Sequence, residues 1–300
     1  MKKLLILATI AIPVWGHSQS FYNLRLPRNV NVYGGVLNSQ YIGDLYPGSG
    51  RGQRNGLNAG VEYFIGGRVS VRSEFNAFRL YGSDALAPPE NADEQGARNL
   101  SFFSNNKELN VSGTLNLLPL PNRFDQRPYV NIYGFAGFGL LWMNPKTKYQ
   151  GDNVALQPLQ TEGVRYSRIQ PVFPVGFGLR IKVRMVYSIV FEGGYRFTNT
   201  DYLDDVSGRP DPGGLAFKGR YADPATLKSP LAIALSDRRQ EKDPASNFPY
   251  TFGVRGNPST KDSYFLFNVR FEYYLKEVFD TYNRGRNKLL YIRKNRQGRR

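Results

Sequence analysis

Few side chains in this sequence could carry out covalent or acid–base chemistry. His17 is the only histidine, and the chain has no cysteine. Ser-His-Asp and Cys-His catalysis, thiolate chemistry and ordinary zinc or copper sites all require histidine or cysteine side chains. These chemistries are therefore excluded for the chain that follows His17. The sequence has no phosphate-binding Gly-Lys-Ser/Thr loop either. We expect no cofactor and no bound metal.

Carboxylates are the remaining acid–base candidates, and the densest group is Asp201, Asp204 and Asp205. A carboxylate hydrolase is one interpretation of this group. The other is structural, because aspartates that follow a strand accept backbone hydrogen bonds and fold the next loop. The spacing does not match an EF-hand calcium loop. We favour the structural interpretation and predict that the protein is not an enzyme.

Alternating apolar and polar residues dominate the elements that would position these carboxylates. In residues 265–275 one parity is Phe, Phe, Val, Phe, Tyr, Leu, whereas the other carries Asn268, Arg270 and Glu272. Such alternation indicates strands with one oily face, and about ten residues is the length that a tilted strand needs to cross a bilayer. Eight such strands are predicted, at residues 30–45, 56–65, 68–81, 100–118, 129–143, 169–183, 187–201 and 263–275.

The connections between these strands alternate between short and long, as in bacterial outer-membrane barrels with periplasmic turns and extracellular loops. We therefore predict an all-β fold, an eight-stranded antiparallel up-and-down transmembrane β-barrel in the cell outer membrane. Gly66-Gly67 should make a tight two-residue turn. The loop of residues 203–260 should contain a short amphipathic helix near residues 225–240. The alternative is a soluble lipocalin-like barrel with its oily parity inside.

Charges of both signs occupy the parity that faces the barrel interior. An eight-stranded barrel is only wide enough for its own side chains, so these charges should neutralise one another as a packed ionic plug. The alternative is an ion path, as in a narrow channel or a small-ligand-binding barrel. The predicted set is Glu62, Arg72, Glu74, Glu108, Arg180, Glu192, Arg196, Arg270 and Glu272, with Lys182 as a further inward charge.

Two terminal segments differ from the predicted barrel of residues 21–275. Residues 1–20 have a charged start, an apolar stretch and small residues, which is typical of a signal peptide. Residues 276–300 carry nine lysines and arginines against Glu277 and Asp280, and we expect a basic periplasmic tail. Arg293, Lys294 and Arg296 are its candidate partner contacts. The formal net charge is +16, and we interpret this excess of basic residues as suited to contact with the anionic lipid of an outer membrane. We expect no nucleic-acid binding.

The run from Phe191 to Ser207, FEGGYRFTNTDYLDDVS, resembles a family of Bacteroidota outer-membrane barrels that includes PorG of the type IX secretion system. The run AIALSDR from residue 232 and the DSYF sequence from Asp262 resemble the same family. The matching motif residues are Tyr195, Arg196, Thr198, Asp201, Tyr202, Asp204 and Asp205.

This resemblance implies a non-catalytic barrel that takes part in protein transport and, in some species, gliding motility. Its implied partners are a periplasmic ring lipoprotein and the partner protein of that lipoprotein.

Overall fold

The computed structural model describes residues 28–46, 52–87, 98–121, 124–208, 227–242, 244 and 255–275. The predicted signal peptide and the predicted basic tail, with Arg293, Lys294 and Arg296, lie outside these ranges. Within them, no helix is long and apolar enough to span a membrane.

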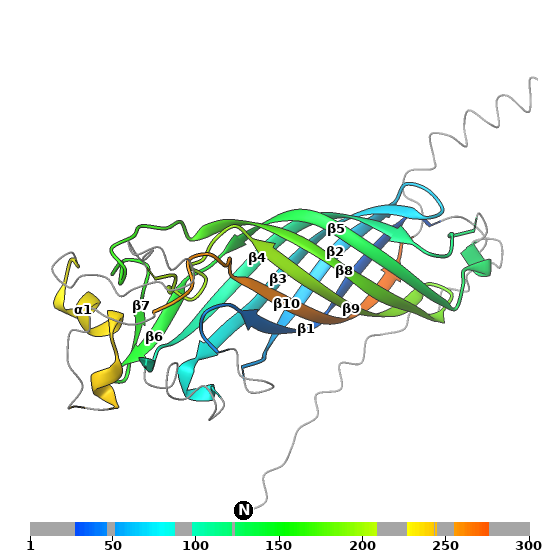
Figure 1. The fold of residues 1–300 in the computed structure, drawn as a ribbon. Coiled ribbons are helices and arrows are strands. Elements are labelled where there is room, and N and C mark those ends of the chain that lie inside the picture. The colour runs from blue at the N-terminus through cyan, green and yellow to red at the C-terminus, as the bar shows by residue number, and fades with distance from the viewer. Residues whose placement is uncertain are drawn as a thin grey trace, which may run out of the picture.

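Eight long antiparallel strands form a closed barrel (Figure 1). Every strand pairs with its neighbour along the barrel wall, and β1 pairs with β10 from Asn31–Tyr274 to Ile42–Ser263, which closes the sheet. The predicted fold class is confirmed. The wall consists of β1 (Val30–Ile42), β2 (Arg54–Phe64), β3 (Val69–Ser83), β4 (Ser101–Asn116), β5 (Val130–Trp142), β8 (Ile169–Arg184), β9 (Tyr187–Thr198) and β10 (Ser263–Tyr274).

The wall of this barrel has its apolar face outside and its charged face inside. This is the arrangement of a membrane barrel and the reverse of that in a lipocalin. Large apolar side chains point outward, and Leu57, Leu115 and Phe177 are 64%, 61% and 73% exposed. Carboxylates and guanidiniums point inward, and Glu62, Glu192 and Arg196 are completely buried. An apolar belt of this extent is stable in hydrocarbon and costly in water. The chain therefore has the exterior of a transmembrane barrel.

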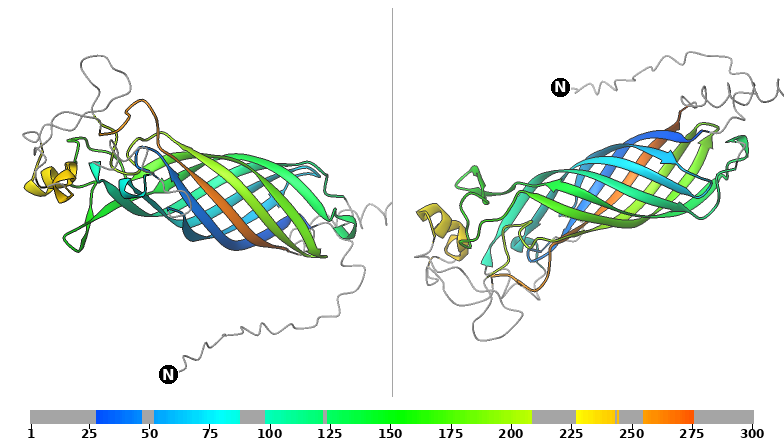
Figure 2. Two further views of the ribbon diagram at one scale, coloured as in Figure 1. Left: turned by 60° about the horizontal axis from the view of Figure 1, so that its bottom comes forward. Right: turned by 90° about the horizontal axis from the view of Figure 1, so that it is seen from above.

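The two ends of the barrel are also different (Figures 1 and 2). At the turn end, short connections join β2 to β3, β4 to β5 and β8 to β9, and both β1 and β10 have their outer termini there. The 3-10 helix η5 (Phe124–Gln126) lies in one of these connections. The loop end carries the long connections, with η2 (Asp84–Leu86), the hairpin of β6 (Pro145–Tyr149) and β7 (Asp152–Ala155), α1 (Pro230–Ser236) and η7 (Arg239–Glu241). By the usual orientation of such barrels, the turn end faces the periplasm.

Several predicted boundaries are wrong by a few residues. The first strand ends at Ile42 rather than at residue 45, because Leu45 turns inward and packs under the loops. The seventh ends at Thr198 rather than at residue 201, since Thr198 donates to the carbonyl of Asp262 and the chain then folds over the mouth. The expected helix of residues 225–240 is confined to Pro230–Ser236, where Ser229 caps it and Leu235 is buried.

Two connections have a different form from the prediction. The connection between the predicted strands of residues 129–143 and 169–183, for which no strand is predicted, contains the hairpin of β6 (Pro145–Tyr149) and β7 (Asp152–Ala155). Its turn uses positive φ at Gln150 (49°) and Gly151 (95°), as a two-residue primed turn requires. Gly66-Gly67 lies in a four-residue connection between Phe64 and Val69, and neither glycine has a left-handed φ.

Apolar clusters lie at both ends of the barrel interior. At the turn end, Phe64, Phe124 and Tyr274 pack together and close the bore. At the loop end a larger cluster joins side chains of the strand ends, such as Tyr41, to loop residues that include Leu156, Leu203 and Leu235. The polar interior between these two clusters is therefore enclosed by side chains from above and below.

Candidate functional site

Two groups of buried charges are candidates for a functional site. The first, here called the bore cluster, holds all nine predicted interior charges, Glu62, Arg72, Glu74, Glu108, Arg180, Glu192, Arg196, Arg270 and Glu272, each at most 4% exposed. The second, the loop-end acid cluster, consists of the buried Asp201, Asp204, Asp205 and Asp262 together with the half-buried Asp44. The first lies between the strands, and the second lies among the loops that cover the barrel mouth.

Glu192 on β9 is the centre of the bore cluster. Arg72 Nη1 and Nη2 donate to its two carboxylate oxygens at 2.5 and 3.0 Å. Arg270 Nη2 donates to Glu192 Oε2 at 2.8 Å, and the Tyr133 hydroxyl donates to the same oxygen at 2.6 Å. One carboxylate thus joins strands from opposite parts of the wall, and its negative charge is shared by two guanidiniums.

Arg180 makes a second ion bridge nearer the turn end. Its guanidinium contacts Glu62 Oε2 at 2.7 Å and Glu272 Oε2 at 2.8 Å. Glu62 also accepts hydrogen bonds from Asn31 at 2.9 Å and from Ser70 at 2.5 Å. Buried carboxylates that keep this many donors retain their charge without water.

Toward the loop end, Glu74 and Glu108 face Arg270 and Arg196. Arg270 contacts Glu74 at 2.9 Å, while Arg196 lies 3.8 Å from Glu74 and 3.9 Å from Glu108. Arg196 donates a hydrogen bond from Nη1 to the carbonyl of Gly194 at 2.7 Å, and Glu108 accepts one from the Tyr264 hydroxyl at 2.7 Å.

Aromatic rings fill the space between the guanidiniums and the wall. Arg72 lies over Phe135, Arg270 over Tyr33 and Arg180 over Tyr133, with ring-centroid distances of 4.2, 4.4 and 4.9 Å. Such stacking is favourable for a desolvated cation. Five carboxylates and four guanidiniums, packed with rings, occupy the bore as a nearly neutral plug.

Lys182 shares the inward parity of β8 with Arg180, as expected, but it pairs with no carboxylate of this plug. It lies at the turn end, where its ammonium donates to the carbonyls of Asp125 and Arg127 at 3.1 and 3.2 Å. Arg127 there donates to Ser188 at 2.7 Å and lies 4.3 Å from the Tyr274 ring centroid. These contacts fasten η5 over the bore.

The motif residues that carry the family resemblance are spread over three places. Tyr195 lies on the outer face of β9, and its ring centroid is 4.7 Å from that of Phe197. Arg196 lies in the bore. Thr198, Asp201, Tyr202, Asp204 and Asp205 lie at the loop end, where Tyr202 stacks on Tyr166 with centroids 4.9 Å apart.

A single phenol joins two carboxyl groups in the loop-end acid cluster. The Tyr41 hydroxyl lies 2.7 Å from Asp204 Oδ2 and 2.9 Å from Asp262 Oδ1. One hydroxyl has one proton to donate, so it donates a hydrogen bond to one carboxylate and can accept a hydrogen bond from the other carboxyl group when that group is protonated. Burial, together with the mutual repulsion of neighbouring carboxylates, holds the pKa values of Asp204 and Asp262 well above their usual range.

The other acids of this cluster hold the long loops together. Asp205 accepts hydrogen bonds from Thr161 and Tyr166 at 2.5 Å each, and it has a left-handed φ of 70°. Asp44 accepts from the Asn257 backbone at 2.9 Å. Burial raises the pKa of Asp44 and of Asp205 to about 6, and that of Asp201 to about 7. These carboxyl groups are therefore partly protonated near neutral pH, Asp201 most of all.

Arg98 and Arg255 complete the loop-end contacts, and sequence reasoning missed both. Arg98 binds both carboxylate oxygens of Asp84, at 2.9 and 2.7 Å, and donates to the carbonyls of Asp44 and Arg255. Arg255 contacts Glu162 at 2.7 Å and Thr161 at 3.1 Å. No local spacing indicates these pairs, since they join segments up to 157 residues apart.

The contacts of the loop-end acid cluster therefore join the loops to one another and to the strand ends, and we call this set of contacts the loop-end junction. Asp204 and Asp205 are 1% and 3% exposed, and their oxygens bind hydroxyls and backbone amides. Over the described ranges, no group of three or more Asp, Glu, His or Cys side chains is arranged to hold a metal ion.

Comparison with solved structures finds bacterial outer-membrane barrels. Ail of Yersinia pestis is 11% identical over 83% of this chain and all of its own, with a TM-score of 0.39. Neisserial surface protein A is 9% identical over 82% of this chain and 97% of its own, with a TM-score of 0.40. OprG of Pseudomonas aeruginosa is 8% identical over 85% and 99%, with a TM-score of 0.41.

Neither protein-family models nor curated proteins give a match to the sequence. The assignment consequently rests on the barrel's own surfaces, the apolar belt outside and the ionic plug within. The protein is an outer-membrane β-barrel. Its loop end then faces the outside of the cell, and its turn end faces the periplasm.

Proposed function

We propose that this barrel is a non-catalytic anchor in the outer membrane, a component of the type IX secretion machinery that contacts its periplasmic ring proteins. The observation that supports an anchor best is the filled bore. Glu192, Arg72 and Arg270 cross-link β9, β3 and β10 through the barrel axis. A barrel whose interior is occupied in this way offers its surfaces, and not a conduit, for function.

The link to type IX secretion is supported by the run of residues 191–207 and its resemblance to the PorG-containing family of Bacteroidota. In this chain, five motif residues, Thr198, Asp201, Tyr202, Asp204 and Asp205, belong to the junction that holds the extracellular loops. Contact with the ring lipoprotein and its partner protein is proposed for the opposite end. The candidates there are the short turns, together with the basic tail outside the described residues.

A narrow channel is the alternative, and planar-bilayer recording separates it from the anchor. The anchor predicts no steady conductance from the purified barrel, because guanidinium–carboxylate pairs and the ring cluster of Phe64, Phe124 and Tyr274 occupy the axis. A steady, large conductance from a single folded barrel would contradict the plug.

The contacts of the loop-end acid cluster also argue against a carboxylate hydrolase. Asp204 and Asp205 bind Tyr41, Thr161 and Tyr166, so their oxygens are committed to the fold. We therefore expect Asp204→Ala and Asp205→Ala to loosen the loops. Loss of a hydrolytic activity in these two variants, with loops that remain protected from proteolysis, would favour the enzyme instead.

Crosslinking followed by affinity capture in the native cell tests the anchor directly. Full-length protein should recover the ring lipoprotein and its partner protein, and a chain that ends at Leu275 should recover several-fold less. The triple change Arg293→Gln, Lys294→Gln, Arg296→Gln is compared with Arg284→Gln, Arg286→Gln, Lys288→Gln, which removes the same charge. Absence of both ring proteins from the full-length capture would refute the anchor, whereas equal capture by the shortened chain would discard only the tail.

A further inference from the structure

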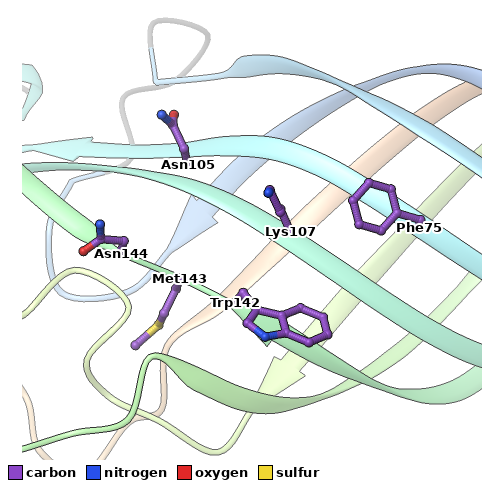
Figure 3. A pocket seen from close by; sticks show the side chains of 6 residues that line it. All are labelled: Phe75, Asn105, Lys107, Trp142, Met143 and Asn144. Carbon is purple, nitrogen blue, oxygen red and sulfur yellow. The ribbon is translucent and has the colours of Figure 1, made fainter.

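A groove of about 500 Å³ lies on the outer face of the barrel wall, near the loop end (Figure 3). Phe75 of β3, Lys107 of β4 and Trp142 of β5 come from three adjacent strands, and Lys107 is in direct register with Trp142. The remaining lining residues are Asn105, Met143 and Asn144. The groove combines two rings with one ammonium group on a surface that faces lipid.

The position of Lys107 along β4 places its ammonium at the edge of the membrane. The outward residues below it, Leu109, Val111 and Leu115, are apolar and 46–61% exposed. Asn105 above it is polar and exposed. A lysine stem can lie along such an apolar surface while its charge stays at the level of the lipid head groups.

Among the residues that the structure describes, the outward charges of β3 and β4 near this groove are all positive. Arg79 of β3 pairs in register with Asn105 and lies over the Phe103 ring at 4.3 Å, diagonal to Lys107. The exposed Arg168 also lies beside the groove, because the backbone amide of the lining residue Met143 donates to the Arg168 carbonyl at 2.8 Å. The carboxylates of β3 and β4, Glu74 and Glu108, point into the bore. At the rim of β1, Asn38 and Gln40 are the outward residues and are neutral.

We propose that this groove binds a phosphorylated glycolipid of the outer leaflet. Lys107 and Arg79 hold a phosphate of the head group, and an acyl chain lies against Phe75 and Trp142. Ammonium and guanidinium groups at a membrane boundary, with no competing carboxylate on the same face among the described residues of the wall, complement a phosphate in charge and in hydrogen bonding. The inference rests on the outer-membrane location and is independent of the proposed secretion role.

A second groove on the same wall supplies a control within the molecule. It holds about 270 Å³ near the turn end and is lined by Leu115, Leu117, Ile132 and Phe177, with Arg68 as its cation. It faces the opposite leaflet and carries a similar apolar lining. Arg68→Gln thus removes one outward positive charge without touching the upper groove.

The test uses the mature protein in nanodiscs of phosphatidylcholine, a zwitterionic lipid. Of the two tryptophans, Trp15 lies in the predicted signal peptide, so Trp142 reports on its own groove. Bisphosphorylated lipid A, the same lipid with its phosphates removed, phosphatidylglycerol and inorganic phosphate are titrated while Trp142 emission is recorded. Native mass spectrometry counts the lipids that remain bound. The shift of the folded band on unheated gels verifies that every variant is folded.

Bisphosphorylated lipid A should bind at least tenfold more tightly than the phosphate-free lipid or phosphatidylglycerol, and inorganic phosphate should not displace it. Lys107→Gln and Arg79→Gln should each weaken binding about tenfold. Lys107→Arg and Arg68→Gln should bind as the unchanged chain does. Equal binding of the phosphate-free lipid or of phosphatidylglycerol, or displacement by inorganic phosphate, would overturn the proposal without any variant. Unchanged affinity in the double variant Lys107→Gln, Arg79→Gln would also overturn it.

Discussion

Buried carboxylates are stabilised in two different ways in the bore cluster and in the loop-end acid cluster. In the bore, Glu62 and Glu192 each contact at least one guanidinium at 2.8 Å or less. At the loop end, Asp204 and Asp262 share a phenol, and Asp205 binds two hydroxyls. A buried acid remains charged where a cation lies beside it, and otherwise it is stabilised by keeping a proton. The two ends of the molecule should therefore respond differently to mutation and to pH.

The largest effect is expected from Glu192→Gln. This change leaves Arg72 and Arg270 without their shared negative charge in a dry interior, which costs about 3–5 kcal/mol of unfolding free energy. Urea unfolding in lipid vesicles, followed by Trp142 fluorescence, measures it. Phe191→Leu, on the neighbouring outward position, is the control and should cost about 1 kcal/mol or less. Equal stability of the Glu192→Gln variant and the unchanged chain would mean that the plug contributes nothing.

Tyr41→Phe should give the next largest effect, confined to the loop end. It removes the hydroxyl between Asp204 and Asp262 and leaves two buried carboxyl groups short of a partner, at a cost of about 1–3 kcal/mol. Hydrogen exchange of residues 200–208 should accelerate about tenfold or more, while β3 and β9 keep their protection. Tyr195→Phe makes the same chemical change on the outer wall and serves as the control. Acceleration throughout the barrel would contradict the separation of the two regions.

A smaller and graded effect is expected from pH. The folded-state pKa values of Asp44, Asp205 and Asp201 lie at about 6, 6 and 7, above the unfolded value, so the folded loops bind more protons. Their contribution to stability is thus greatest below about pH 4 and declines as pH rises to about 7. Exchange of residues 200–208 should be slower at pH 5 than at pH 8 after correction for intrinsic rates. Loops that are tighter at pH 8 would reverse the assigned sign.

The smallest effect is expected from Lys182→Gln. Lys182 is only partly buried and donates to two carbonyls at the turn end, so its loss should cost less than about 1 kcal/mol. Urea unfolding compares it with Glu192→Gln. A cost similar to that of the Glu192→Gln variant would place Lys182 in the plug after all.

The eight wall strands could be predicted from sequence because alternation sets which residues face lipid and which face the bore. Leu109, Val111 and Leu115 against Glu108, Asn110 and Ser112 on β4 are an example. Which arginine meets which carboxylate could not be predicted. Arg72 and Glu192 lie 120 residues apart, and their approach depends on the stagger of the closed sheet.

Sequence reasoning missed several interior side chains and one hairpin, although the sequence contains a signal for some of them. Tyr33 and Tyr133 lie on the inward parity beside glycines, Gly60 and Gly178, at which a Cβ atom would meet the ring within 2.6 Å. Tyrosines opposite strand glycines are thus a usable sign of inward rings. The β6–β7 hairpin had the Gln150-Gly151 turn as its signal. The contacts of Arg98 and Arg255 depend on how long loops fold and had none.

Nitroxide scanning of β10 tests the central claim most directly, and the absence of native cysteines makes it clean. Single cysteines replace Phe267, Asn268, Val269 and Phe271, and a nitroxide label on each reports collision with oxygen in lipid or with a nickel chelate in water. The account predicts strong oxygen collision at positions 267, 269 and 271, and little collision with either reagent at 268. Strong nickel collision at 267, 269 and 271 would show water where lipid is expected and would contradict the membrane barrel.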